Sequence, residues 1–382
     1  MQDLNDKVEE LIISDGKSAD NSDMESIHNE TIDELTERGN EDQLREKESK
    51  ARADALQNIK DTYGLTEIPD STIEQLPADD ELTSDIPLDT TYIELIHMKI
   101  KSLESLHLEN FTQLELINLR CNLIDSLNSL KYIENKEKME ELDFYDNRIN
   151  HISKHINSFK NLENLDLSFN NIKHIKHIEN LTNLKNLYFV QNKISVIENL
   201  DTLVNLINLE LGGNRILEIS NLDKLTSLQQ LWLGQNKITT LKGLDQLTNL
   251  RILSIQSNKI TKIEGLSNLK SLEELYLADN KIEQLEGLEN LTNLTVLDIT
   301  GNKISKLACL DTLTNLTDLW CSRNLIDDWN NISKSVKNLI NLETVYFENN
   351  PIQRNEPTMY RHKLRLCFGK SLQKIDALYL AN

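Results

Sequence analysis

The 382-residue sequence lacks the features of a secreted or membrane-spanning protein. Its first ten residues contain one Lys among four carboxylates and no apolar stretch, so we expect no secretory leader. No run of about 18 apolar residues occurs, and we therefore expect no membrane-spanning helix. The four cysteines have no paired spacing, which predicts free thiols and an intracellular, reducing location.

Basic residues are scarce in the first quarter of the chain. Residues 1–90 hold 26 Asp and Glu against 8 Lys and Arg, whereas residues 91–382 hold 36 against 33. The first 60 residues are also short of aromatics, and an acidic, polar composition of this kind cannot bury enough apolar surface to fold. We predict that residues 1–88 form an acidic, mostly disordered tail. The nearly neutral remainder lacks the basic footprint that phosphate backbones require, so we expect no nucleic-acid partner.

One pattern, repeated every 22 residues, dominates the rest of the chain. Residues 228–238 and 272–282 follow L-x-x-L-x-L-x-x-N-x-I, and residues 250–260 follow it with Ile255 at the third leucine position; the pattern is the signature of a leucine-rich repeat. Its asparagines are separated by 25, 23, seven times 22, and 26 residues. They are Asn122, Asn147, Asn170, Asn192, Asn214, Asn236, Asn258, Asn280, Asn302, Asn324 and Asn350.

The repeat has a physical logic. In each L-x-L segment the two leucines point to one face of a short strand, and the residue between them points to the other. The asparagine can bond backbone groups of neighbouring coils that would otherwise be unpaired. One coil offers about seven aliphatic positions, worth roughly 1.5–3 kcal/mol each when buried. Ordering its backbone costs on the order of 1–2 kcal/mol per residue, so a coil cannot fold alone and must stack on others.

We therefore predict an α/β fold, a right-handed leucine-rich-repeat solenoid of the horseshoe type. Its parallel sheet would line the concave side, short 3₁₀ or helical turns the convex side, and both ends would be capped. Residues 89–350 would form about 12 coils, mostly of 22 residues, beginning in degenerate form near Ile93. Residues 351–382 would form a C-terminal cap, with a helix between Pro357 and Gly369 and a returning segment over the last coil.

The residue between the two leucines of each L-x-L segment forms the most informative column. From position 166 to 320 it recurs every 22 residues, so it should form one exposed stripe along the concave sheet, at about 4.7–4.9 Å per strand. Five of its eleven members are aromatic and four are acidic, in a chain that is 5% aromatic. Aromatics fit a pleated surface in any case, but exposed Trp and Tyr beside charges are typical of interfaces. The eleven are Asn118, Asp143, Asp166, Tyr188, Glu210, Trp232, Ser254, Tyr276, Asp298, Trp320 and Tyr346.

Several stretches resemble one family of leucine-rich-repeat proteins. They are residues 142–147 (LDFYDN), 324–329 (NLIDDW), 342–351 (LETVYFENNP) and 375–377 (IDA). With the 22-residue period, they make residues 90–380 similar to the leucine-rich-repeat regulatory subunit of protein phosphatase 1, called regulatory subunit 7. The resemblance implies a non-catalytic subunit of the nucleus and cytoplasm whose concave face holds the phosphatase catalytic subunit. It also implies a role in the cell cycle, namely in chromosome segregation. A further inhibitor subunit is implied as a second partner.

The same resemblance implies which residues bind the partner. The family's residue type is kept at Asp166, Glu210, Asp298, Trp320 and Tyr346. Where the family usually has Phe, Phe and Glu, this sequence has Tyr188, Trp232 and Asp318. The two ring changes keep an apolar contact but add polar atoms that need partners. The sequence contains no docking motif of a basic residue, Val or Ile, any residue, and Phe or Trp, so binding would use the folded face.

Few residues are arranged for catalysis or metal binding. His151 and His174 hold the same position in adjacent coils, but no Cys or carboxylate completes a metal site. The pair Asp327 and Asp328 lies in a predicted loop, and no glycine-rich phosphate loop or nucleophile motif is present. We expect no enzyme, no cofactor and no metal. The prediction is a phosphatase 1 regulatory subunit that is monomeric on its own. The alternative is an adaptor of the same fold for another intracellular partner, ribonucleoprotein or cytoskeletal.

Overall fold

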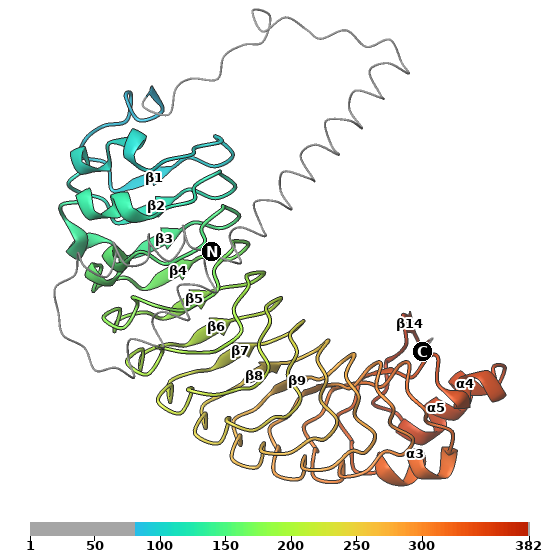
Figure 1. Cartoon of the computed structure of the whole chain (residues 1–382). Helices are drawn as coiled ribbons and strands as arrows, with labels where there is room; N and C mark the ends of the chain where they lie inside the picture. The colour runs from blue at the N-terminus through green and yellow to red at the C-terminus, as the bar shows by residue number, and fades with distance from the viewer. Residues whose placement is uncertain (1–80, 381–382) are drawn as a thin grey trace, which may run out of the picture. The chain divides into compact units, whose positions relative to one another are not determined.

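The computed structural model describes residues 81–380, and its strands follow the period of the sequence. Within these residues one sheet holds fourteen strands in chain order along a curved body (Figure 1). Strands β1 to β13 pair in parallel with their neighbours, and β14 pairs antiparallel with β13. The predicted leucine-rich-repeat solenoid with a parallel sheet is therefore confirmed. The strands are β1 Tyr92–Glu94, β2 Leu116–Asn118, β3 Glu141–Asp143, β4 Asn164–Asp166, β5 Asn186–Tyr188, β6 Asn208–Glu210, β7 Gln230–Trp232, β8 Ile252–Ser254, β9 Glu274–Tyr276, β10 Val296–Asp298, β11 Asp318–Trp320, β12 Thr344–Tyr346, β13 Lys374–Ile375 and β14 Leu378–Tyr379.

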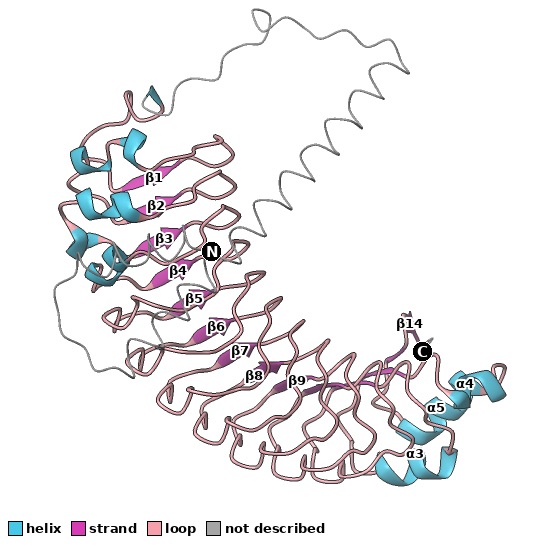
Figure 2. Ribbon diagram, in the orientation of Figure 1, coloured by secondary structure: helices cyan, strands magenta, loops and turns pink. Residues whose placement is uncertain are grey.

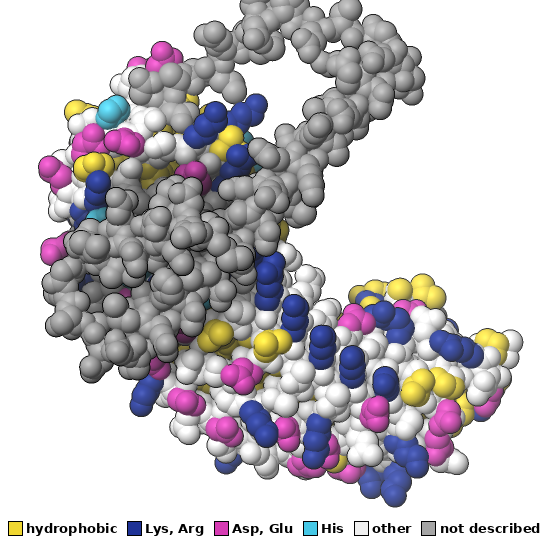
Figure 3. All heavy atoms as spheres, in the orientation of Figure 1, with side chains coloured by type: hydrophobic (Ala, Val, Ile, Leu, Met, Phe, Trp, Pro, Cys, Tyr) yellow, Lys and Arg dark blue, Asp and Glu magenta, His cyan; other side chains and the backbone are white. Residues whose placement is uncertain are grey.

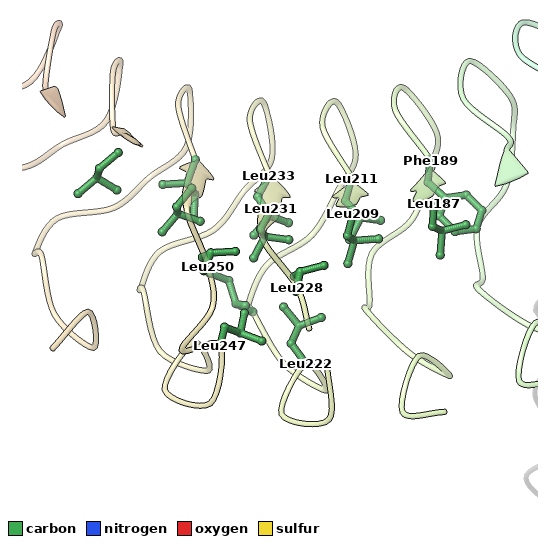
Figure 4. Close-up of a cluster of buried hydrophobic side chains, with 14 of the residues drawn as sticks. Leu187, Phe189, Leu209, Leu211, Leu222, Leu228, Leu231, Leu233, Leu247 and Leu250 are labelled. Carbon is green, nitrogen blue, oxygen red and sulfur yellow. The ribbon is translucent and has the colours of Figure 1, made fainter. Parts of the chain in front are cut away.

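The leucines of each L-x-L segment form the core. Leu231 and Leu233 are fully buried beside Leu209 and Leu211 of the preceding coil (Figure 4). Leu231 lies directly opposite Leu209 in the parallel register, because each 22-residue coil brings the chain back to the equivalent position on the next strand. Every coil thus buries its apolar side against two neighbours, which is why the array and not the single repeat is the stable unit.

The predicted asparagine ladder is also present. The side chain of Asn258 is buried, and its Oδ1 accepts a hydrogen bond from the backbone N–H of Ile238, in the preceding coil, at 2.9 Å. Its Nδ2 donates to the carbonyl of Leu233 at 2.9 Å and to that of Ile255 at 3.0 Å. One amide therefore satisfies backbone groups of two coils that the turn leaves without strand partners.

Helices lie mainly at the two ends of the described residues, and the middle coils close through loops (Figure 2). The prediction of 3₁₀ or single helical turns holds, but in a middle coil such as residues 239–250 only isolated turns form, with Leu247 N–H bonded to the Leu244 carbonyl at 3.0 Å. Asp328, predicted to lie in a solvated loop, instead caps α3 by accepting from the N–H groups of Asn330 and Asn331. The helices are η3 Glu104–Leu106, η4 Leu108–Asn110, η5 Asn128–Tyr132, η6 Lys136–Lys138, η7 Lys154–Ser158, α3 Trp329–Ser335, α4 Pro351–Asn355 and α5 Tyr360–Phe368.

The C-terminal residues differ in detail from the single helix that was predicted. A short helix, α4, starts at Pro351, and the longer α5 starts at Tyr360 and ends before Gly369, whose φ is 80°. Asp376, next to the Ile375 that pairs with Val345, accepts from the Phe347 N–H with its Oδ1 at 3.0 Å, where the preceding coil uses a strand carbonyl, that of Tyr346, for the N–H of Cys321. Residues 1–80 of the predicted tail and residues 381–382 of the predicted cap lie outside the described residues.

Candidate functional site

The sheet register brings the predicted stripe together. Asp166, Tyr188, Glu210 and Trp232 lie directly opposite one another on successive strands β4 to β7. Ser254, Tyr276, Asp298, Trp320 and Tyr346 continue the row on β8 to β12. Asp318 lies in the neighbouring row, opposite Val296 and Thr344. All eight residues expected to bind a partner are therefore on the same face of one sheet, in the order that the period predicts.

The expectation that the whole stripe is exposed is wrong for some of its members. Asp298 and Asp143 are each only 7% exposed and Ser254 2%, while the rings of Trp232 and Trp320 are half-buried. A local hydrogen bond explains the preference for Asp. The Oδ1 of Asp298 accepts from the N–H of Thr300 at 2.9 Å, and that of Asp166 accepts from the N–H of Ser168 at 2.8 Å. These carboxylates therefore stabilise the chain where it leaves the strand, in addition to any contact with a partner.

Two aromatic rings close over Asp298. In the register, Asp298 lies between Tyr276 and Trp320, which are two strands apart. Their ring centroids are nevertheless only 6.2 Å apart, so both rings lean over the strand between them. The ring of Tyr346 continues the cluster, 5.9 Å from that of Trp320. A cation of a partner protein would reach Asp298 only after these rings part.

Burial makes the charge of Asp298 unfavourable. Desolvation raises the pKa of its carboxyl, and the hydrogen bond from the Thr300 backbone opposes that shift only in part. The folded chain therefore keeps this proton to a higher pH than the unfolded chain, whose Asp titrates near about 4. The stability that Asp298 contributes is present at acid pH and is lost as the pH rises through the raised pKa.

We therefore expect Asp298→Asn to raise the melting temperature at pH 7. The amide is neutral and keeps the oxygen that accepts from Thr300. Thermal unfolding from about pH 3 to about pH 8, a range that brackets the titration of Asp, is the measurement. The gain over the wild type should shrink as the pH falls. A gain of the same size at every pH would show that the charge of Asp298 is not its cause.

The two tryptophans of the stripe each hold an unpaired donor. The indole Nε1 atoms of Trp232 and Trp320 are buried and have no hydrogen-bond partner among the described residues. An unpaired buried donor costs about 1–3 kcal/mol, so native structures rarely keep one without a reason. Beside Trp320 is a shallow hollow of about 380 Å³, lined also by Tyr346, Ser322 and Arg323. The Trp320 end of the stripe therefore combines apolar rings, an unpaired N–H and room for a side chain of another molecule.

Arg120, which the sequence analysis missed, lies among two carboxylates and an aromatic ring at the other end of the stripe. Arg120 lies with its Nη1 2.7 Å from Asp143 Oδ2 and 3.5 Å from Asp166 Oδ2. Its guanidinium carbon also sits 4.0 Å above the ring of Tyr145, which packs 4.8 Å from the ring of Phe169. Asp166 is thus partly neutralised within the chain. The available signal was Phe169 itself, a ring 41% exposed at a turn position where no other coil carries an aromatic residue.

The other candidate residues stay apart. His174 has its Nδ1 3.2 Å from Glu198 Oε1, and in residues 81–380 no three side chains of His, Cys, Asp or Glu are grouped to hold a metal ion. Across the same residues, no helix has the length and apolarity to cross a bilayer.

Comparison with known proteins agrees with this architecture. The family model described as "Leucine Rich repeats (2 copies)" matches residues 204–246, 248–290 and 292–334. The chain is a leucine-rich-repeat solenoid. Two solved structures share the fold of the solenoid. Internalin InlF of Listeria monocytogenes is 25% identical, with 82% of this chain and 92% of the internalin covered at a TM-score of 0.59. A leucine-rich-repeat protein of Leptospira interrogans is 22% identical, with 72% and 81% covered at a TM-score of 0.55.

Two curated relatives are similar to part of this chain in sequence. "Protein phosphatase 1 regulatory subunit SDS22" of Saccharomyces cerevisiae is 51% identical over 86 residues, which are 22% of this chain and 25% of the relative. The protein of the same name in Schizosaccharomyces pombe is 46% identical over 85 residues, 22% of this chain and 24% of the relative. The chain thus spans about a quarter of the length of these relatives. The resemblance to phosphatase 1 regulatory subunits is confirmed over that stretch.

Proposed function

We propose that the solenoid is a non-catalytic regulatory subunit that binds the catalytic subunit of protein phosphatase 1 through its concave stripe. The observation that carries the proposal is the pair of half-buried tryptophans, Trp232 and Trp320, with unpaired indole N–H groups. Such rings on one face are the usual hot spots of protein interfaces. The partner is named by the similarity to SDS22 proteins, whose printed name is regulatory subunit of phosphatase 1.

The stripe has two kinds of contact to offer. The rings of Tyr188, Trp232, Trp320 and Tyr346 would supply most of the affinity by being desolvated. Glu210 and Asp318, half-buried carboxylates, would meet basic groups of the phosphatase and set its orientation and association rate. Asp166 and Asp298 would contribute less than the sequence suggests, since one is shared with Arg120 and the other lies under two rings.

The proposal also covers the cellular location, the oligomeric state and the cellular role of the protein. We propose a nuclear and cytoplasmic protein that is monomeric on its own, acts in chromosome segregation and assembles with a further inhibitor subunit. The support for these points is the family resemblance of residues 90–380 alone.

A pull-down from cell extract tests the partner. The full chain is used as bait beside the double variant Trp232→Ala/Trp320→Ala and the control Tyr132→Ala, which removes a ring 45% exposed on η5, away from the stripe. The wild type and the control should retain the phosphatase 1 catalytic subunit, identified by mass spectrometry, and the double variant should lose it. A different protein with the same pattern of retention and loss would keep the stripe as the binding face and reject the phosphatase as the partner.

A further inference from the structure

A second charged feature lies along the loops that follow the strands. The residue after the ladder asparagine is cationic in six consecutive coils, and we name this row the basic ladder. Figure 3 shows a row of Lys and Arg side chains along one edge of the body. The members are Lys193, Arg215, Lys237, Lys259, Lys281 and Lys303.

The backbone holds the basic ladder at a fixed spacing. The N–H of Lys237 donates to the carbonyl of Ile216 at 2.9 Å, and the N–H of Lys259 donates to that of Ile238 at 2.8 Å. The same bond recurs in all six coils. Successive cations are therefore about 4.8 Å apart at the backbone, and the six extend over roughly 24 Å.

Within residues 81–380, no acidic side chain pairs with most of this row. From Lys193 to Lys259, no Asp or Glu stands within two residues of a ladder position. The first acids in those neighbouring positions are Asp279 and Glu283, and both are already paired, with Arg323 at 2.9 Å and with Lys303 at 3.5 Å. Among residues 81–380, the first five members of the basic ladder have no carboxylate at ion-pair distance. Four of those five are exposed, and Lys193 is half-exposed.

We propose that the basic ladder is a docking surface for an acidic helical segment of a partner protein, separate from the concave stripe. An unpaired row of like charges repels itself, and an anionic partner removes that repulsion while gaining its own ion pairs. The net charge of residues 91–382 is close to zero and so does not reveal this row, because the acidic residues that compensate it lie at other positions of the coils.

The spacing identifies the shape of the occupant. Carboxylates at i and i+3 or i+4 of an α-helix are about 5–6 Å apart, close to the spacing of the coils. Carboxylates on one face of an extended strand are about 6.6 Å apart, a spacing too wide for each of them to meet successive cations of the basic ladder. A helix of about 16 residues covers the roughly 24 Å of the row. A nucleic acid fits this surface less well, because the basic ladder is a single row of cations. The carboxylate of Glu210, on the neighbouring strand, would also repel phosphate groups.

Fluorescence anisotropy with the full chain tests the proposal. The probe is a labelled helix-forming peptide of 18 residues with Glu at i, i+3 and i+4 positions along one face. The variant Lys237→Glu/Lys259→Glu reverses two central, unpaired members of the ladder and should weaken binding about 10-fold or more, an effect that diminishes with added salt. The control Lys224→Glu/Lys270→Glu changes the net charge equally at exposed positions outside the ladder, and should stay within about 2-fold of the wild type.

Two further probes decide the chemistry. A peptide of the same composition with its Glu residues spread around the helix should bind several-fold more weakly than the striped one, and equal binding would reject the helical occupant. A single-stranded oligonucleotide of equal charge that binds more tightly than the striped peptide, with the same dependence on Lys237 and Lys259, would make the row a nucleic-acid site instead. If the ladder variant and the control lost peptide affinity equally, the proposal that the basic ladder is a docking surface would be wrong. None of these outcomes depends on whether phosphatase 1 binds the concave stripe.

Discussion

Trp320→Ala is expected to weaken binding of the phosphatase 1 catalytic subunit by about 2 kcal/mol or more, roughly 30-fold in Kd. Trp320 lies at the centre of the aromatic cluster, 6.2 Å from the ring of Tyr276 and 5.9 Å from that of Tyr346, and its indole N–H is unpaired. Truncation removes the ring area that a partner would cover and the donor that a partner would satisfy. Isothermal titration calorimetry with purified phosphatase measures the loss.

Two controls separate binding from folding. Trp320→Phe keeps a six-membered ring but removes the N–H and the rest of the pyrrole ring, so its affinity should lie between those of the wild type and Trp320→Ala. Tyr132→Ala removes an exposed ring outside the stripe and should leave the Kd within about 2-fold. Thermal unfolding of each variant checks that the solenoid stays folded. If Trp320→Ala bound as tightly as the wild type, Trp320 would be removed from the site.

Asn258→Ala is expected to lower the free energy of unfolding by about 3 kcal/mol, the largest effect on stability among our predictions. The change leaves the buried N–H of Ile238 without its acceptor and removes the donor that three backbone carbonyls share. Each buried polar group left unpaired costs about 1–3 kcal/mol, and Ala supplies no replacement. Urea unfolding followed by circular dichroism gives the difference.

The matched control is Asn249→Ala. Asn249 is exposed, and its Nδ2 makes one bond, to the Thr226 carbonyl at 2.9 Å, so the loss should be about 1 kcal/mol or less. Asn258→Asp keeps the acceptor for Ile238 but loses all three donor bonds, and it should be at least as unstable as Asn258→Ala at pH 7. Equal stability of Asn258→Ala and Asn249→Ala would contradict the role assigned to the ladder.

Much of the stripe could be predicted because the repeat converts sequence position into position in space. Residues 22 apart must stack when every coil has the same length, so the sequence alone predicts that Tyr188, Glu210 and Trp232 lie in one row, as the register shows. The alternation of strand side chains then decides which residues face the core. Neither step needs knowledge of long-range contacts, because the period itself supplies them.

The environment of each member could not be predicted in the same way. That Asp298 is covered depends on the rotamers of rings two strands apart, and that Asp166 meets a cation depends on an arginine two coils away. Single turns were expected in every coil, but which coils extend them into regular helices could not be predicted, since tertiary packing rather than local propensity decides whether such a short segment becomes a helix.

The sequence by itself determined the solenoid, its register, its buried leucines and asparagines and the order of the concave row, because a fixed period leaves one way to stack the coils. Only the tertiary structure decided which of the row's carboxylates are accessible and which tryptophan N–H groups lack a partner. It also decided whether the cations of Lys193 to Lys259 are neutralised. Accessibility and pairing depend on side chains from two or three coils at once, and no single repeat contains that information.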